Sequence, residues 1–354
     1  MRGRIQALKN SFKKAKIDGY IVAGETNIFY FTNAVGATRL LVPAEGENVL
    51  YVRGVNYDAV KETARGCRVD LVKPGEDIDK KVAVLIKKLK LKCVGYDTLD
   101  SSVYLKLKKA LKETGLKAMN QLVWELRKIK DKTELGHIKR AAEITNEGVR
   151  RAVEVIKLGI REYEVAAEIE YAMRKLGSQG VAFETIVASG PRSAFPHGGC
   201  TNKKIQKGEL IVLDLGAKYE HYGADITRTL LIGKPSRKQA KIYEIVRKAQ
   251  QMAFESLRGG VKVKDADGTA RRIIEQAGYG ECFVHRLGHG IGLDTHEPPT
   301  LGSEAKDLLK VGNVVTVEPG VYIGGFGGVR IEDTVLIHKE RAERLTKATY
   351  DLCV

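Results

Sequence analysis

Hydrophobic and polar positions along the first 125 residues predict strands that alternate with helices. Short apolar runs bounded by polar turns predict strands at residues 19–24, 39–43, 48–52, 67–72 and 92–97. Apolar positions spaced three or four apart predict helices at about 56–65, 77–90 and 101–113. One further helix stripe lies near the beginning of the chain, at Ile5, Leu8, Phe12 and Ile17. This alternation is typical of an α/β domain.

The pattern changes near residue 125, where a long amphipathic helix is expected to begin at Thr133. Its apolar stripe consists of Leu135, Ile138, Ala142, Val149, Val153 and Ile156. Further helices are expected at about 162–176, 236–258 and 263–276, among strands and glycine-rich turns. We therefore predict two domains, an α/β domain at residues 1–125 and an α+β domain at residues 126–354.

Composition excludes several classes of protein. The chain has 354 residues, of which 43% are hydrophobic and 29% charged, so it is not a disordered chain. It contains no apolar run long enough for a transmembrane helix and no secretory pattern near its beginning, so we expect it in the cytoplasm, away from membranes. Its five cysteines are widely spaced and form no Cys-x-x-Cys pair, which argues against disulfides and thiolate zinc sites.

The net charge is +16 and is spread over the whole chain. No basic motif interleaved with aromatic residues accompanies it, so we interpret the charge as favouring solubility or heat stability. The sequence thus argues against nucleic acid as a partner.

The first chemical signal is Asp214, which lies within the apolar run at residues 210–215. An ionised carboxylate inside a buried strand is costly unless it is paired or bound to a metal. If the following turn is centred between Tyr219 and Glu220, Asp214 directly faces Asp225 of the next strand. Like charges in that arrangement repel each other, so we expect a cation between them.

A second hairpin, within residues 314–337, repeats the arrangement. With Gly325 at the centre of its glycine-rich turn, Glu318 faces Glu332. Pro319 cannot donate a hydrogen bond to a neighbouring strand, so we expect a bend or an edge directly after Glu318.

Two opposed pairs of carboxylates carry four negative charges, which two divalent cations would balance. A dinuclear metal site is therefore predicted. The candidate imidazole ligand is His289, which lies between two glycines. Carboxylates with one imidazole suit manganese, zinc, iron(II) or cobalt. His197 and His296 lie in other glycine-rich segments of this domain, and His285 is left without a role.

These segments resemble the pita-bread metallopeptidases, a family that includes prolidase, aminopeptidase P, methionine aminopeptidase and creatinase. The segments that carry the resemblance are ASGPRSAFPHGG, LDLGAKYEHYGADITRT, GHGIGLDTHE, TVEPGVY and GVRIED. The first 125 residues resemble the N-terminal domain of prolidases and creatinases. One departure is Arg286, where relatives often have glycine, and we expect it to affect local packing only.

The resemblance implies five metal ligands, with Asp214 on one metal and His289 and Glu318 on the second. Asp225 and Glu332 would bridge both metals. A water between the metals would be the nucleophile, and Glu318 would accept its proton.

The resemblance also implies roles for four residues beside the metals. His197 and His296 would bind the scissile carbonyl or the developing oxyanion. Thr227 would hydrogen-bond the bridging water or a ligand, and Arg330 would orient a ligand.

The implied activity is hydrolysis of X–Pro bonds in a small peptide with proline at the second position. The N-terminal domain and the chain length favour dipeptides. Two alternatives stay open: an aminopeptidase acting on longer X–Pro peptides, and a non-catalytic module of this fold that binds nucleic acid or protein. Five intact ligands argue against a metal-free relative such as creatinase. By analogy with relatives, we expect a homodimer.

Overall fold

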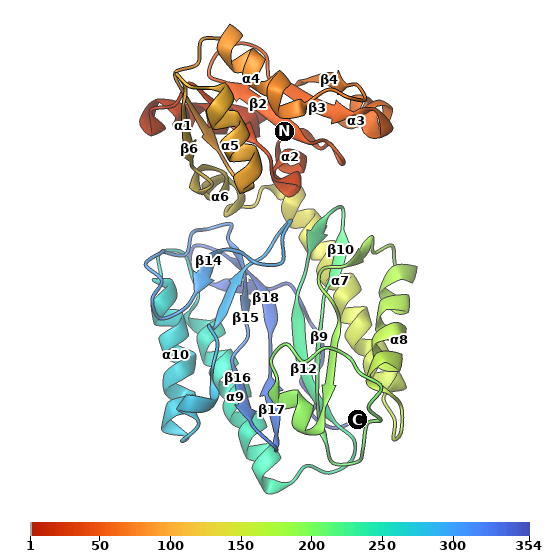
Figure 1. Cartoon of the computed structure of the whole chain (residues 1–354). Coiled ribbons are helices and arrows are strands. Elements are labelled where there is room, and N and C mark those ends of the chain that lie inside the picture. The colour runs from red at the N-terminus through yellow and green to blue at the C-terminus, as the bar shows by residue number, and fades with distance from the viewer. Residues whose placement is uncertain (1) are drawn as a thin grey trace. The chain divides into compact units, whose positions relative to one another are not determined.

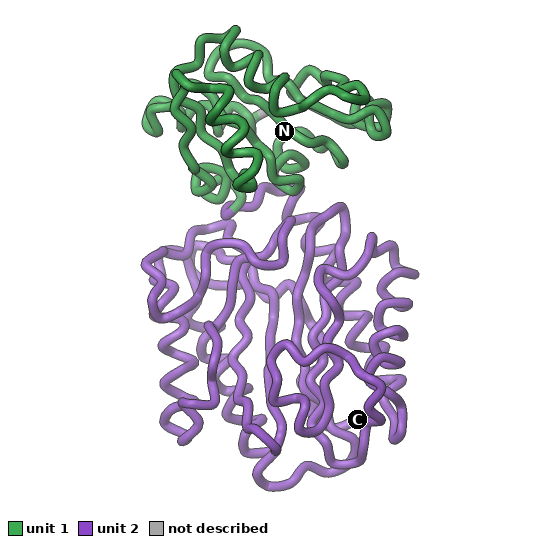
Figure 2. The backbone as a smooth tube through the Cα atoms, viewed as in Figure 1, with its two compact units in different colours: residues 1–127 green, residues 128–354 purple. Residues whose placement is uncertain are grey.

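The chain divides after Arg127 into two compact units (Figure 2). The structure, a computed structural model, describes residues 2–354. The hydrophobic pattern predicted an α/β domain followed by an α+β domain, and both are present.

The N-terminal unit is built on a six-stranded sheet in the order β4-β3-β2-β1-β5-β6 (Figure 1). Its strands are β1 (Gly19–Val22), β2 (Arg39–Pro43), β3 (Val49–Arg53), β4 (Arg68–Val72), β5 (Cys93–Tyr96) and β6 (Gly115–Ala118). Its α-helices are α1 (Arg2–Ala15), α2 (Glu25–Thr32), α3 (Tyr57–Thr63), α4 (Ile78–Lys88), α5 (Ser101–Ala110) and α6 (Gln121–Arg127). The five predicted strands are confirmed, whereas β6, α2 and α6 were not predicted.

The second unit places its central strands between two pairs of helices (Figure 1). The helices are α7 (Lys132–Val155), α8 (Glu162–Lys175), α9 (Arg237–Ser256) and α10 (Val263–Gln276). The strands that carry the candidate site are β8 (Ile186–Ser189), β9 (Leu210–Leu215), β10 (Ala217–Tyr219), β11 (Tyr222–Gly223) and β12 (Ile226–Leu231). They continue with β13 (Gly288–Gly290), β14 (Glu297–Leu301), β15 (Val314–Val317), β16 (Gly320–Ile323), β17 (Gly327–Arg330), β18 (Asp333–Ile337) and β19 (Ala342–Arg344). β7 (Gly180–Val181) pairs with β10.

Two hydrophobic clusters support these strands from opposite sides. One packs α7 and α8 against β8, β9 and β12. The other packs α9 and α10 against the strands from β15 to β18. The strands between them are therefore buried on both flanks, and charged side chains there need partners.

A capping box fixes the beginning of α7. The Asp131 carboxylate accepts a hydrogen bond from the Glu134 amide at 2.9 Å, and Glu134 accepts one from the Asp131 amide at 2.9 Å. The helix begins at Lys132, one residue before the predicted start.

The first carboxylate hairpin differs from the prediction by two residues in register. Thr227, rather than Asp225, lies opposite Asp214. The turn consists of Glu220 and His221, both with positive φ (46° and 68°), so it is centred one residue later than expected. A shift of two residues keeps every side chain on its face, so both aspartates still belong to the same side of the hairpin.

The second carboxylate hairpin has the predicted register about Gly325. Gly320 pairs with Arg330 and Val317 pairs with Asp333. Glu318 and Glu332 lie between these two ladders. The ladder is interrupted after Val317 and resumes at Gly320, so the bend expected at the proline is present.

A buried ion pair joins the two hairpins behind these carboxylates. Arg228 donates from Nη2 to Asp333 Oδ1 at 2.9 Å and from Nη1 to the Glu332 carbonyl at 2.6 Å. Arg228 follows Thr227, and Asp333 follows Glu332, so this pair lies on the side of the strands away from the carboxylate site. It fixes the backbone from which the carboxylates project.

No helix among residues 2–354 combines the length and the apolar character needed to cross a membrane.

Candidate metal centre

Three side chains from separate segments bring ligand atoms to one place. One atom each of Asp225, His289 and Glu332 lies within 4.8 Å of the other two. Asp225 precedes β12, His289 is in β13, and Glu332 follows β17. Both carboxylates are buried, with exposed fractions of 4% for Asp225 and 1% for Glu332. A divalent cation would lie at the point where these atoms converge.

Unpartnered oxygens point to the same conclusion. Among residues 2–354, Asp214 Oδ1, Asp225 Oδ1 and Glu332 Oε1 are buried and accept no hydrogen bond. Each buried oxygen of this kind lowers the stability of the folded protein by about 1–3 kcal/mol unless it binds a hydrogen-bond donor or a cation. Buried oxygen ligands around one imidazole are the donor set that first-row divalent metals take, so the residues present fit the metal that the sequence predicts.

Glu318 joins the cluster through His289. Its Oε1 lies 3.3 Å from His289 Nε2, and it accepts a hydrogen bond from Thr316 Oγ1 at 3.1 Å. His289 Nε2 lies 3.8 Å from Asp225 Oδ2. The other ring nitrogen, Nδ1, is 3.0 Å from the Gly290 carbonyl, so Nε2 is the nitrogen that faces the carboxylates.

Glycine allows the strand that carries His289 to fit between its neighbours. A Cβ on Gly288 would lie 2.1 Å from the Thr316 carbonyl oxygen, and one on Gly290 would lie 2.4 Å from the Pro298 carbonyl oxygen. Any larger residue at either position would push β13 away and displace the imidazole.

Arg330 connects the remaining carboxylate to the cluster. It donates from Nη2 to Asp214 Oδ2 at 2.6 Å and from Nε to Thr227 Oγ1 at 3.0 Å. Thr227 in turn donates to Glu332 Oε2 at 2.6 Å. The structure thus brings together all five predicted ligands with Thr227 and Arg330, and both of these residues hold carboxylates of the site.

Two residues, Tyr322 and His285, extend the hydrogen-bond network of Arg330 and were given no role from the sequence. Tyr322 Oη lies 2.9 Å from Arg330 Nη1 and 2.8 Å from His285 Nε2. Burial raises the pKa of Tyr322 to about 12, so its hydroxyl stays protonated. The spacing along the second hairpin could have indicated Tyr322. It lies on β16, two positions from Gly320, which pairs with Arg330.

The two other histidines lie beside this cluster. The rings of His296 and His289 are 4.4 Å apart between centroids. Burial and the charge of His289 lower the pKa of His296, and the charge of His197 acts in the same direction. His197 is exposed on the loop that follows Pro196, whose carbonyl oxygen is 3.3 Å from Arg330 Nη1. The His296 ring thus lies beside a proposed ligand, and His197 lies on a loop that contacts Arg330.

The carboxylates of the cluster differ in the direction in which their pKa values are shifted. Burial and the charges of neighbouring carboxylates raise the pKa values of Asp225 and Glu332 well above their usual range. Burial acts on Glu318 in the same direction, but the hydrogen bond and charge of His289 outweigh it and lower the pKa of Glu318 to about 2. Glu318 is thus ionised, whereas Asp225 and Glu332 lack the positive charge they need.

Comparison with known families identifies the chain. The model of metallopeptidase family M24 matches residues 136–339, and that of the creatinase/prolidase N-terminal domain matches residues 4–129. The chain belongs to metallopeptidase family M24. The family is one of metal-dependent enzymes, in agreement with the carboxylate and imidazole cluster.

Named relatives are similar over their full length. The chain is 41% identical to the Xaa-Pro dipeptidase of Pyrococcus furiosus, covering 99% of this chain and 100% of that protein. The crystal structure of the prolidase from Pyrococcus horikoshii OT3 has a TM-score of 0.92 at 39% identity and covers 99% of both chains. The X-Pro aminopeptidase from Thermotoga maritima MSB8 has a TM-score of 0.88 at 35% identity, covering 98% of this chain and 100% of that one.

Proposed function

We propose that this M24 enzyme hydrolyses X–Pro dipeptides and holds two divalent metal ions, of manganese, cobalt, zinc or iron. The observation that carries the proposal is the convergence of four carboxylates and His289, with three buried oxygens that accept no hydrogen bond. The Xaa-Pro dipeptidase and prolidase similar to this chain support the choice of substrate.

The proposed ligands are Asp214, Asp225, His289, Glu318 and Glu332. Bound divalent ions lower the pKa of water and polarise a carbonyl group. The four carboxylates carry four negative charges, and Arg330 adds a positive charge that the sequence-based balance omitted. With two divalent ions the site keeps one positive charge, which suits an anionic ligand.

The protein's own groups complete the proposed reaction. The Glu318 carboxylate, 3.3 Å from His289 Nε2, is proposed to accept a proton from the attacking water. That proton then passes to the proline nitrogen as the X–Pro bond breaks. An X–Pro bond has no N–H, so binding cannot depend on that donor and must rest on the carbonyl group.

His197 and His296 are proposed to bind the substrate carbonyl oxygen and the charge that develops on it. The His296 ring lies beside that of His289, and His197 follows Pro196, whose carbonyl oxygen contacts Arg330. Arg330 holds Asp214 and Thr227 in place, and the Thr227 hydroxyl fixes one Glu332 oxygen, so each of these residues restricts a proposed ligand.

The second candidate is an aminopeptidase that acts on longer X–Pro peptides, because the Thermotoga maritima X-Pro aminopeptidase is also similar over the whole chain. Hydrolysis of Met-Pro and of Met-Pro-Gly distinguishes the two. We expect kcat/KM for Met-Pro to exceed that for Met-Pro-Gly by about tenfold or more, about 1.4 kcal/mol of transition-state stabilisation. The opposite order would favour the aminopeptidase.

Metal analysis of the same sample tests the proposed number of ions, with about two per chain expected. Salt-sensitive binding of nucleic acid without any peptidase activity would favour the non-catalytic alternative. By analogy with relatives we also propose that the chain forms a homodimer. Light scattering tests this by measuring the molar mass in solution, and we expect twice the mass of one chain.

A further inference from the structure

The second unit begins with a segment, residues 128–131, that is fixed to the strand leading to Glu318. The Lys130 amide donates to the Gly312 carbonyl at 3.0 Å, and Asn313 Nδ2 donates to the Lys128 carbonyl at 2.8 Å. Gly312 and Asn313 directly precede β15. The backbone around Lys130 thus has a defined place in the fold.

The side chain of Lys130 forms a buried ion pair. Its Nζ lies 3.1 Å from Glu297 Oε2, and the two side chains are only 1% and 2% exposed. The second oxygen, Glu297 Oε1, accepts a hydrogen bond from the Asp294 amide at 3.1 Å. Because both side chains are removed from water, breaking this ion pair is costly, and the pair restricts the position of Glu297.

Glu297 is the first residue of β14, directly after the loop that joins the two histidines. It directly follows His296, and its backbone pairs with Gly290, the residue after His289. The loop packs tightly on the ion pair, because a Cβ on Gly292 would lie 2.9 Å from Glu297 Oε1 and 3.1 Å from Lys130 Cε. A shift of Glu297 would therefore move His296 relative to His289.

We propose that Lys130 is a positioning residue for His296: through its ion pair with Glu297, it holds the His296 imidazole beside His289. This inference rests on the function proposed for His296. Lys130 itself touches neither substrate nor metal in this proposal, so its effect on catalysis passes through the loop. Positioning errors of about 1 Å can cost about 100-fold in rate.

A double-mutant cycle tests the proposal with the metal-loaded enzyme. We expect Lys130→Met to lower kcat on Met-Pro by about tenfold to 100-fold, with about a twofold change in KM or less. In the His296→Ala background the same substitution is expected to lower kcat less than about twofold, because the group it positions is gone. Equal fold losses in both backgrounds would overturn the proposal, and so would full activity of Lys130→Met.

The cycle also separates this inference from the proposed function. Full activity of His296→Ala would remove the role of His296, and a loss with Lys130→Met in that case would show that Lys130 acts otherwise. A loss with His296→Ala but none with Lys130→Met would leave the proposed function intact and overturn only the inference.

A second readout does not depend on activity. In metal-free protein with 13C-labelled histidine, Lys130→Met is expected to shift the ring resonances of His296 and to leave those of His338 unchanged. His338 is paired with the partly exposed Glu343, at 2.9 Å, and so serves as the internal reference. Unchanged His296 resonances would contradict the proposal.

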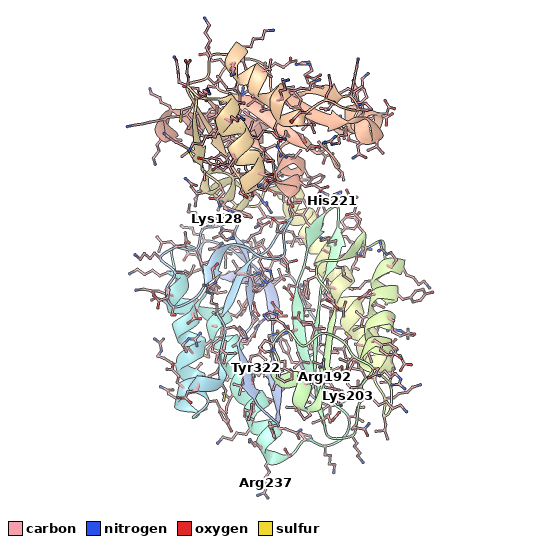
Figure 3. The ribbon with its side chains drawn as sticks, viewed as in Figure 1. Lys128, Arg192, Lys203, His221, Arg237 and Tyr322 are labelled. Atoms are coloured by element: carbon pink, nitrogen blue, oxygen red, sulfur yellow. The ribbon has the colours of Figure 1, made fainter. Side chains whose placement is uncertain are left out.

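Two further variants guard against a trivial loss of stability. Lys130→Met/Glu297→Leu removes both charges, which proteins often tolerate, so it keeps the test available if the single variant does not fold. We expect this double variant to lower kcat as much as Lys130→Met does when His296 is present. When His296 is replaced by alanine, we expect the double variant to cause no further loss. Lys128→Met is the matched control (Figure 3), since it removes a lysine charge from the same segment and breaks an ion pair with Asp307, which is about half exposed. It is expected to keep full activity. Recovery of full activity in the double variant would contradict a positioning role.

Discussion

Glu318→Gln is expected to lower kcat for Met-Pro by about 10³-fold, the range that loss of a general base gives. The carboxylate lies among the proposed ligands, 3.3 Å from His289 Nε2, and accepts a hydrogen bond from Thr316 Oγ1 at 3.1 Å. Glutamine has nearly the same shape but cannot accept the proton. Steady-state kinetics at saturating metal measures the effect.

Glu340→Gln is the matched control for this substitution, because the Glu340 side chain is 79% exposed and is paired with Lys339 rather than with a residue of the cluster. It is expected to keep full activity. Thermal unfolding of both variants shows that the fold is retained. A Glu318→Gln enzyme with the activity of the unmodified protein would remove Glu318 as the base.

Asp225→Asn is expected to abolish activity and to stabilise the metal-free protein. Asp225 is buried among Glu332, Asp214 and Glu318, and both burial and these charges raise its pKa. An amide removes the repulsion and supplies a donor to a neighbouring carboxylate. The free energy of unfolding of the metal-free protein should rise by about 1–3 kcal/mol at pH 8. Denaturant unfolding after chelation measures it.

The stability of the metal-free protein is expected to depend on pH in a defined direction. A carboxyl group with a raised pKa in the folded state binds protons more tightly there, so the protein loses stability as pH rises from the ordinary carboxyl pKa of about 4. Glu318, with its pKa lowered to about 2, is ionised throughout pH 5–8 and does not contribute to the change.

The stability difference between Asp225→Asn and the unmodified metal-free protein should therefore grow from pH 5 to pH 8. Asp351→Asn, at an exposed position near the C-terminus, is expected to show no such trend. A destabilised metal-free Asp225→Asn protein would contradict the account of an uncompensated carboxylate cluster.

Periodicity alone was sufficient for most of the fold. The four helices of the second unit were predicted to within about two residues because each has a buried stripe along its length. The helix α2 was missed because ETNIFYFT is rich in aromatic and branched residues, which favour strands, while tertiary burial makes it helical. The strand β6 was missed because it is an exposed edge strand with only Leu116 partly buried along GLKA.

The candidate site could be predicted because hairpin pairing follows from the turn. The turn centred on Gly325 gave the correct register, since the glycines mark its centre. The turn at Glu220 and His221 carries no glycine, so its centre was placed one residue early and Asp225 was wrongly set opposite Asp214.

Contacts between distant segments could not be read from the sequence. Tyr322 contacts Arg330 and His285 only after β16, β17 and the segment before β13 have packed together. The pair of Arg228 and Asp333 likewise depends on two hairpins that are separated by about 100 residues. Neither contact leaves a local pattern of spacing or composition.

The central claim is that the five acidic and imidazole ligands hold two divalent ions side by side. Anomalous diffraction at the manganese edge, from crystals grown with Mn²⁺, tests it most directly. The account predicts two peaks about 3.5–4 Å apart, both bounded by Asp214, Asp225, His289, Glu318 and Glu332. Peaks elsewhere in the molecule, or no peak among these five side chains, would contradict it.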